Sequence, residues 1–290
     1  METVGIIAAV LSALFMGTIG IFSKLTGLSS ETVTFCRLFF GAGFMGLFLL
    51  CIGRVQCLRQ WPSWLVLING GMLAGFIIFY VQAMNFTTMA NAIMLVYLAP
   101  VAASLFAHLF LGEKLSWSGL LLICSALFGF AMMMEFTIDI QGGSDHLLGI
   151  GCGLISMVAY AAFILLNRIV KTDIHVYTRT FYQLLAGAAV MLPLLALDPP
   201  TISPVNWLWM IGTGFLPGFL AIFCAVMALS RLPAATFGTL AYVEPVAVVI
   251  FGWVLFNETL SSLQMGGCAV IIFSGIIQAY LSSRQKQSKV

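Results

Sequence analysis

The sequence predicts an all-α integral membrane protein with ten transmembrane helices, arranged as two five-helix repeats of inverted topology. Three observations lead to this fold class: the composition, ten apolar runs of spanning length, and an internal repeat. Hydrophobic residues make up 61% of the chain and charged residues only 8%, whereas ordinary soluble domains carry roughly 25% charged residues. Such a chain cannot cover a globule with polar surface, so its solvent must be lipid.

A transmembrane helix needs about 20 mostly apolar residues. Ten runs meet this requirement, and short connections rich in turn residues join them. The first run lacks the basic segment of a signal peptide and has a counterpart in the second half, so we expect it to be retained. The predicted spans are 4–23, 32–52, 64–83, 90–110, 117–135, 147–167, 177–197, 207–227, 234–255 and 262–282.

The internal repeat is clearest at residues 97–116, YLAPVAASLFAHLFLGEKLS, which return at residues 242–261 as YVEPVAVVIFGWVLFNETLS. The offset is 242 − 97 = 145 residues, half of the chain. A repeat of this length indicates a duplicated structural unit. We therefore expect two units, residues 1–145 and residues 146–290.

Weaker similarity extends the repeat to other helices: the segment starting at Gly5 resembles the one at Gly149, and that at Phe35 resembles that at Phe181. Because each unit has five helices, an odd number, the second unit starts on the opposite side of the membrane. Many secondary transporters have this inverted repeat, with the substrate site near mid-membrane between the halves.

Lysine and arginine residues predict the orientation, because cytoplasmic loops carry an excess of both. With the N-terminus in the cytoplasm, the outer loops hold only Lys24, and Arg37 lies within a span. We therefore expect both termini in the cytoplasm and a bacterial inner membrane as the location. The basic residues of the inner loops are Arg54, Arg59, Lys114, Arg168, Lys171, Arg179, Arg231, Arg284, Lys286 and Lys289. The acidic residues of the outer side are Glu31, Glu135, Asp139, Asp145, Asp198 and Glu258.

Several function classes find no support in the sequence. The net charge of +2 comes without a basic cluster, so we expect no nucleic-acid partner. The seven cysteines form no CxxC motif and the three histidines lie far apart, so we expect no metal and no cofactor. Asp139, Asp145 and His146 look like solvated turn residues. No nucleotide-binding motif or catalytic cluster is present, which argues against an ATP-driven pump and an enzyme.

Pro100 and Pro245 occupy equivalent positions in the middle of two predicted spans. A proline there removes a backbone hydrogen bond and disfavours helical geometry in the preceding residue. Matching breaks in the two halves indicate a binding site in transporters. The alternative is a packing kink without a ligand.

Glu244 and Arg37 are the charged candidates for substrate binding. Glu244 precedes Pro245 near mid-membrane, where its repeat counterpart is Ala99. Arg37 lies about five residues inside the outer end of its span, and its counterpart is Gln183, itself a candidate. Intramembrane charges are costly and usually functional. The two side chains could form a structural pair, Arg37 could reach the outer surface, or they could hold the two ends of a zwitterion.

Polar and aromatic residues within spans complete the candidate set. Tyr97, Ser104 and His108 share one helix face, and His108 falls near the inner end. Glu113 and Glu258 fall in turns, where capping or interfacial solvation is expected. The other members of the set are Tyr160, Tyr242, Gln82 and Asn85. Polar residues on a spanning helix should face the protein interior, so together they predict a cavity lined by rings and hydroxyls.

With these residues, the chain resembles the EamA-type transporters of the drug/metabolite transporter superfamily. The doubled YLAPV…GEKLS and YVEPV…NETLS motif is the most specific element, and Arg37 in the second helix also looks like the family pattern. The resemblance implies a ten-helix carrier of small organic metabolites, of which many relatives export amino acids or their derivatives. It leaves open proton coupling and whether the carrier is a monomer or a homodimer.

We therefore expect a secondary transporter of amino acids or derivatives that works by alternating access, with export as the expected direction. The alternatives are an exporter of cationic amines or drugs, a passive channel, and a membrane-embedded enzyme. Saturable counterflow would separate a carrier from a channel.

Overall fold

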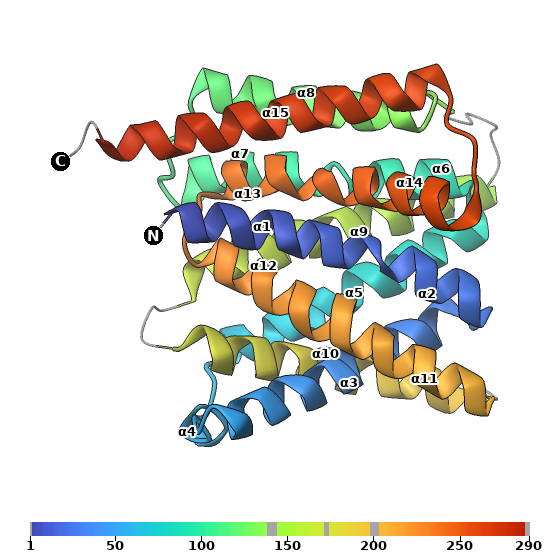
Figure 1. Ribbon diagram of the computed structural model, residues 1–290, viewed down its shortest axis with the longest axis vertical. Coiled ribbons are helices and arrows are strands. Elements are labelled where there is room, and N and C mark those ends of the chain that lie inside the picture. Colours follow the sequence, from blue (N-terminus) through green and yellow to red (C-terminus); the bar gives the residue numbers. More distant parts are fainter. Residues whose placement is uncertain (1, 138–143, 171–173, 198–202, 288–290) are drawn as a thin grey trace.

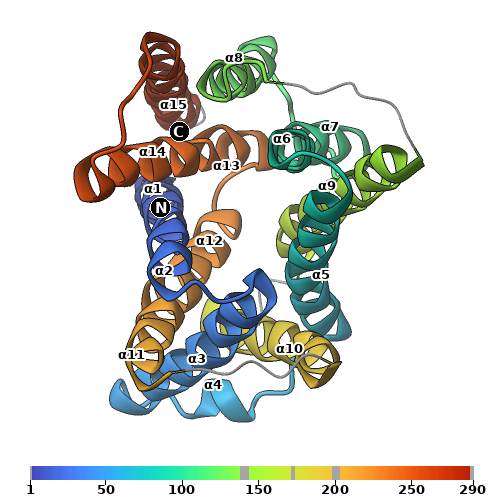
Figure 2. The same cartoon turned by 90° about the vertical axis from the view of Figure 1, so that its right-hand side faces the viewer.

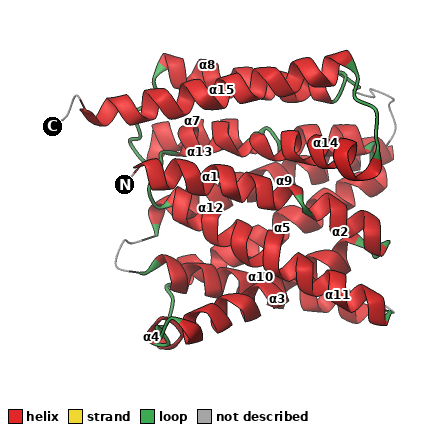
Figure 3. Ribbon diagram, viewed as in Figure 1, coloured by secondary structure: helices red, strands yellow, loops and turns green. Residues whose placement is uncertain are grey.

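The computed structural model describes residues 2–137, 144–170, 174–197 and 203–287. This part of the chain consists of helices joined by loops and turns, without a β-strand (Figure 3). The backbones of Asp139, Lys171, Asp198 and Lys289 lie outside the described residues, as do the side chains of Arg284 and Lys286.

The first repeat forms five spanning segments from seven of its helices, and a short helix lies in the second connection. The helices are α1 (Glu2–Gly17), α2 (Ile19–Thr26), α3 (Ser30–Cys51), α4 (Gln56–Arg59), α5 (Trp64–Phe86), α6 (Met89–Val96), α7 (Ala99–Phe110) and α8 (Trp117–Met133). Only α4, which lies in the connection, was not expected from the apolar pattern.

The second repeat also forms five spanning segments. Its helices are α9 (Ser144–Ile169), α10 (Val176–Leu197), α11 (Pro204–Thr213), the π-helical η1 (Gly214–Leu220), α12 (Ala221–Leu229), α13 (Ala234–Ala241), α14 (Val243–Phe256) and α15 (Ser262–Gln287). Within the described residues, nine segments are long and apolar enough to cross a membrane, and α8 is a shorter apolar helix. The expected ten-helix membrane fold is thus confirmed.

The two proline-containing spans are broken at equivalent points. Helix α6 ends at Val96 and α7 begins at Ala99, so Pro100 stands in the first turn of α7. Helix α13 ends at Ala241, and Pro245 stands in the first turn of α14. A proline is tolerated there because the first N–H groups of a helix have no partner within it.

Two further spans, which were predicted as continuous helices, are interrupted. Between α1 and α2, the hydroxyl of Thr18 donates to the carbonyl of Phe15 at 2.6 Å, a bond that bends helices. Between α11 and α12, the chain widens into η1 around Pro217, which cannot donate a backbone hydrogen bond. Such π-helical turns often occur at functional sites.

Helix α1 begins and α15 ends at the same end of the bundle (Figure 1), as an even number of spans requires. We call this end the terminal face and the other end the opposite face. Figure 2 looks onto the opposite face, where most helices surround the centre and α8 and α15 pack side by side at the edge. The central site is therefore built from the other spans.

Small residues allow close packing between the repeats. A Cβ atom on Gly17 of α1 would lie 2.9 Å from the Cβ of Ala247 in α14. A Cβ atom on Gly153 of α9 would lie 2.5 Å from a methyl carbon of Leu95 in α6. The first helix of each repeat thus packs against the fourth span of the other.

Candidate substrate-binding site

A cavity of about 360 Å³ lies between the repeats. It reaches the opposite face at Ser30 and Met89, which are exposed, and ends near Ser12 and Phe237, which are buried. Its wall is mostly apolar, and its size falls within the usual range of roughly 300–1,000 Å³ for small-molecule sites. The cavity is therefore open toward one face and closed toward the terminal face.

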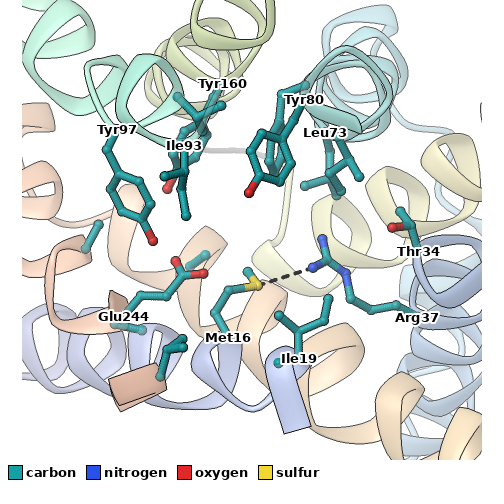
Figure 4. A pocket seen from close by; sticks show the side chains of 18 of the residues that line it. Met16, Ile19, Thr34, Arg37, Leu73, Tyr80, Ile93, Tyr97, Tyr160 and Glu244 are labelled. Atoms are coloured by element: carbon teal, nitrogen blue, oxygen red, sulfur yellow. Dashed lines mark hydrogen bonds between the residues drawn. The ribbon is translucent and has the colours of Figure 1, made fainter. Parts of the chain in front are cut away.

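Arg37 and Glu244 lie on facing walls of this cavity (Figure 4). Arg37 is 3% exposed; its Nη1 donates to the sulfur of Met16 at 3.5 Å, and its Nε and Nη2 have no hydrogen-bond partner. Glu244 has no ion pair in the described part of the chain, where the two salt bridges join other residues. The cavity therefore presents a cation and an anion that do not satisfy each other.

The chain break before α14 explains how Glu244 reaches the cavity. Because α13 stops at Ala241, Glu244 falls in the first turn of a new helix, where unpaired N–H groups and the helix dipole favour a negative charge. Gly17 packs closely beneath this turn, since a Cβ atom there would lie 3.3 Å from the carbonyl oxygen of Glu244. The break and the glycine together position the carboxylate.

Three tyrosines line the cavity on the side of α5, α6 and α9: Tyr80, Tyr97 and Tyr160 (Figure 4). The ring of Tyr160 stacks on Phe76 with centroids 4.9 Å apart. Tyr97 and Tyr160 were predicted, but Tyr80 was not. Its signal was the helical spacing of Leu73, Phe76 and Tyr80, which form one face of α5 that lines the cavity.

Five predicted residues do not line the cavity. They either lie near lining residues in the sequence or are the counterparts of lining residues in the other repeat. Gln183 is fully buried and donates to the Oδ1 of Asn167 at 2.9 Å, so it joins α10 to α9. Ser104 donates to the carbonyl of Pro100 in its own helix at 2.7 Å. Pro100 and Pro245 are buried in the first turns of α7 and α14.

Tyr242, the fifth of these residues, connects the two chain breaks. It is fully buried, and its hydroxyl donates to the carbonyl of Tyr97 at 2.5 Å. Tyr97 and Tyr242 are repeat counterparts, and their ring centroids are 5.8 Å apart. The two breaks therefore meet at the centre of the molecule.

The remaining polar residues also lie away from the cavity. His108 is exposed, and its Nδ1 lies 2.8 Å from the carbonyl oxygen of Glu113. Gln82 is half-buried and Asn85 is exposed near the end of α5, and neither lines the cavity. Of the face predicted from Tyr97, Ser104 and His108, only Tyr97 reaches the site.

We expect Tyr242→Phe to weaken substrate binding, because it leaves the carbonyl of Tyr97 without its donor and frees the break beside the cavity. Loss of such a buried bond costs about 1–3 kcal/mol, which thermal unfolding measures. Tyr182→Phe is the matched control, since the hydroxyl of Tyr182 donates to the carbonyl of Leu58 at 2.8 Å away from the cavity. Equal losses of affinity in both variants would contradict a role at the site.

The backbone of Arg37 rests on η1. A Cβ atom on Gly218 would lie 2.3 Å from the carbonyl oxygen of Arg37, so α3 and η1 are in contact at a position that only glycine permits. We expect Gly218→Ala to displace Arg37, to lower stability by about 1–3 kcal/mol and to weaken binding. Gly43→Ala on α3 is the control, because a Cβ atom there meets nothing within 4 Å. Unchanged affinity in Gly218→Ala would show that η1 does not position Arg37.

Ten spanning segments in two inverted repeats around a central cavity define the architecture of a membrane transporter. The family model of the EamA-like transporter family matches residues 3–135 and again residues 147–280. The chain therefore belongs to this family and is a membrane transporter.

Individual relatives agree with this assignment over nearly their whole length. The chain is 29% identical over 273 residues to an uncharacterized transporter of Archaeoglobus fulgidus, covering 94% of this chain and 95% of the relative. It is 25% identical over 279 residues to a Pseudomonas aeruginosa protein named pseudopaline exporter CntI, covering 94% of each. Because the family and these relatives are named as transporters, they argue against a membrane-embedded enzyme.

A solved crystal structure has the same fold. It superposes with a TM-score of 0.84 over 98% of both chains, at 22% sequence identity. At this identity the likeness extends to the fold alone.

Proposed function

We propose that this protein is a secondary transporter that exports small zwitterionic metabolites, namely amino acids or their derivatives, by alternating access. One observation carries the proposal: Arg37 and Glu244 face one cavity without pairing with each other or with any other charged residue of the described chain. A buried charge without a partner costs several kcal/mol. A ligand with a carboxylate and an ammonium group would satisfy both.

The walls of the cavity suit such a ligand. The guanidinium of Arg37 has two free N–H-bearing nitrogens, which match the two oxygens of a carboxylate. Glu244 would bind the ammonium group beside the hydroxyls of the nearby tyrosines (Figure 4). Apolar residues between these ends, such as Ile93 and Leu73, would contact the carbon skeleton.

The orientation of the protein follows from the positive-inside tendency. Arg54, Arg59, Lys114 and Arg231 lie in connections at the terminal face, whereas Lys24 lies at the opposite face. We therefore propose that the terminal face is cytoplasmic, in the inner membrane of a bacterium. Export as the direction is supported by the similarity to a relative named as an exporter.

Proton coupling belongs to the same proposal. A carboxylate that is neutralised in turn by a substrate ammonium group and by a proton would exchange one for the other across the membrane. Glu244 is the acidic residue that lines the cavity. One chain forms the whole lining of the cavity, which supports the monomer as the transporting unit in this proposal.

The test is counterflow in proteoliposomes that hold the full chain, with amino acids, amines without a carboxylate, carboxylates without an amine, and sugars. The proposal expects saturable exchange of amino acids. Exchange of amines alone would favour the alternative of a cation exporter. The three tyrosines near Glu244 support this alternative, because aromatic rings attract cations. Non-saturable leakage would indicate a channel.

A further inference from the structure

The terminal face is held closed by a three-part contact between the repeats. Glu113, in the turn after α7, accepts from the Nε of Arg168 at 2.7 Å and from the backbone N–H of Ala234 at 2.8 Å. Arg168, near the end of α9, also donates to the carbonyl of Leu229 at 2.8 Å. The side chains of Arg168 and Glu113 are only 22% and 17% exposed. The carboxylate of Glu113 thus ties the first repeat to the first residue of α13.

The residues that correspond to this contact by the internal repeat lie at the opposite face. There, among the described residues, only the ion pair is formed, without the hydrogen bond to a helix N-terminus. Glu258 corresponds to Glu113 (258 − 113 = 145), and Lys24 corresponds to Arg168 (168 − 24 = 144) in the alignment that pairs Gly5 with Gly149. The Nζ of Lys24 lies 2.5 Å from the Oε1 of Glu258, and their side chains are 53% and 52% exposed. The ion pair is present, but it lies in the open.

The missing part is the backbone N–H at the start of α6. Ala234, which Glu113 binds, corresponds to Met89 (234 − 89 = 145). Met89 is 65% exposed and lies on the rim of the cavity, and the hydrogen bond of Glu258 in the described structure goes to Lys24. The carboxylate of Glu258 is therefore available to a helix N-terminus that has not reached it.

The two half-helices that begin at Ala234 and Met89 also differ in burial: the one at the terminal face is more buried than the one at the opposite face. Helices α6 and α13 have eight residues each, and each ends at a central chain break. In α13 seven residues are buried, whereas in α6 only Asn91, Ala92 and Val96 are. The buried half-helix α13 closes the terminal face, whereas the more exposed half-helix α6 leaves the cavity open to the opposite face.

The central contact between the breaks offers a pivot for both half-helices. The hydroxyl of Tyr242 donates to the carbonyl of Tyr97, at the position where α6 and α13 end. Each half-helix is therefore joined to the centre of the molecule at its C-terminal end. At its N-terminal end, α13 is bound by the carboxylate of Glu113, whereas in the described structure α6 is not bound by the corresponding carboxylate of Glu258.

We propose that Glu113 and Glu258 are alternating latches. In the state described here, Glu113 binds the N-terminus of α13 and closes the terminal face. In the other state, Glu258 binds the backbone N–H of Met89 and closes the opposite face, while Glu113 releases Ala234. The ion pairs with Arg168 and Lys24 persist in both states and hold the carboxylates in place. The proposal rests on alternating access but not on the identity of the substrate.

The physical basis is that a carboxylate gains a charge-assisted hydrogen bond and a favourable dipole interaction at a helix N-terminus. Only one of the two latches can be complete at a time, because closing one face separates the helices at the other. Each latch therefore biases the equilibrium between the states in the opposite direction.

Cysteine accessibility tests this in the full chain with its native cysteines replaced, without any substrate. Met89→Cys reports on the opposite face and Ala234→Cys on the terminal face, and a polar maleimide reads each in detergent. Glu113→Gln should slow labelling at residue 89 by about tenfold and accelerate it at residue 234, because it weakens a hydrogen bond to a charged group. Glu258→Gln should do the reverse.

Glu135→Gln is the control for a lost charge, because Glu135 is exposed and takes part in neither salt bridge of the described chain. If Ala234→Cys fails to fold, residue 89 alone reports both directions. Labelling that shifts the same way in both Gln variants, or that matches the control in either, would overturn the latches. Failure of counterflow with amino acids would instead affect only the proposed substrate.

Discussion

Replacing Glu244 with glutamine should strongly weaken the binding of amino acids and, at the same time, raise the melting temperature of the substrate-free protein. The substitution keeps the shape of the side chain but removes a charge that has no ion pair in the described structure. Removing one partner of a close charge pair typically costs 2–5 kcal/mol, so affinity should fall by about a hundredfold or more. Glu244 is half-buried in a mostly apolar cavity, where an unpaired carboxylate destabilises the empty site, so the neutral amide should stabilise it by about 1–3 kcal/mol.

The opposite signs of these two effects separate a substrate site from a structural pair. Isothermal titration with an amino acid that the counterflow assay identifies measures affinity, and thermal unfolding without ligand measures stability. Glu135→Gln, an exposed change at the opposite face, should alter neither. A fall in stability of Glu244→Gln would mean that Glu244 has a structural partner. Unchanged affinity would remove it from the site.

The fold could be predicted from the sequence because each of its determinants is local or repeated. The apolar runs fix the spans, and the doubled motif around Pro100 and Pro245 fixes the two matching breaks. The π-helical turn η1 could not be predicted, because Pro217 within an apolar run is compatible with a simple kink as well. The contact of Gly218 with Arg37 that it permits depends on the packing of α3.

The residues that line the cavity could be predicted where a charge, a chain break or a tyrosine within a span marks them. Arg37 and Glu244 stand out because intramembrane charges are rare, and both line the cavity. Repeat symmetry does not carry over to the lining of the cavity: Tyr97 and Arg37 line it, whereas their counterparts Tyr242 and Gln183 do not. The reason is that the cavity opens to one face only, so equivalent positions of the two repeats have different surroundings.

Glu113 illustrates the same limit at the edge of the bundle. Capping or interfacial solvation was expected in its turn, and its carboxylate does accept the first N–H of a helix. That helix, α13, belongs to the other repeat, which local sequence does not reveal. Its counterpart Glu258 forms an exposed ion pair instead. Two residues with the same motif thus have different contacts in one state of the protein.

Arg37→Gln should have the complementary effect to Glu244→Gln, because it removes the other charge. We expect amino acids to lose about a hundredfold or more in affinity, whereas amines that lack a carboxylate should bind as well as to the unaltered protein or better. The reason is that Arg37 is 3% exposed and two of its nitrogens have no hydrogen-bond partner. An approaching cation would no longer meet this charge.

Arg37→Lys distinguishes geometry from charge at the same position. Lysine keeps the positive charge but cannot bind both oxygens of a carboxylate at once, so affinity for amino acids should recover only in part. Titrating an amino acid, its decarboxylated amine and its deaminated acid against Glu244→Gln, Arg37→Gln and Arg37→Lys assigns each end of the substrate to one residue. If Arg37→Gln lowered the affinity for the amine and the amino acid equally, Arg37 would support the cavity without binding a carboxylate. If the two residues hold a zwitterion, Glu244→Gln should weaken binding through the ammonium group and Arg37→Gln should weaken binding through the carboxylate.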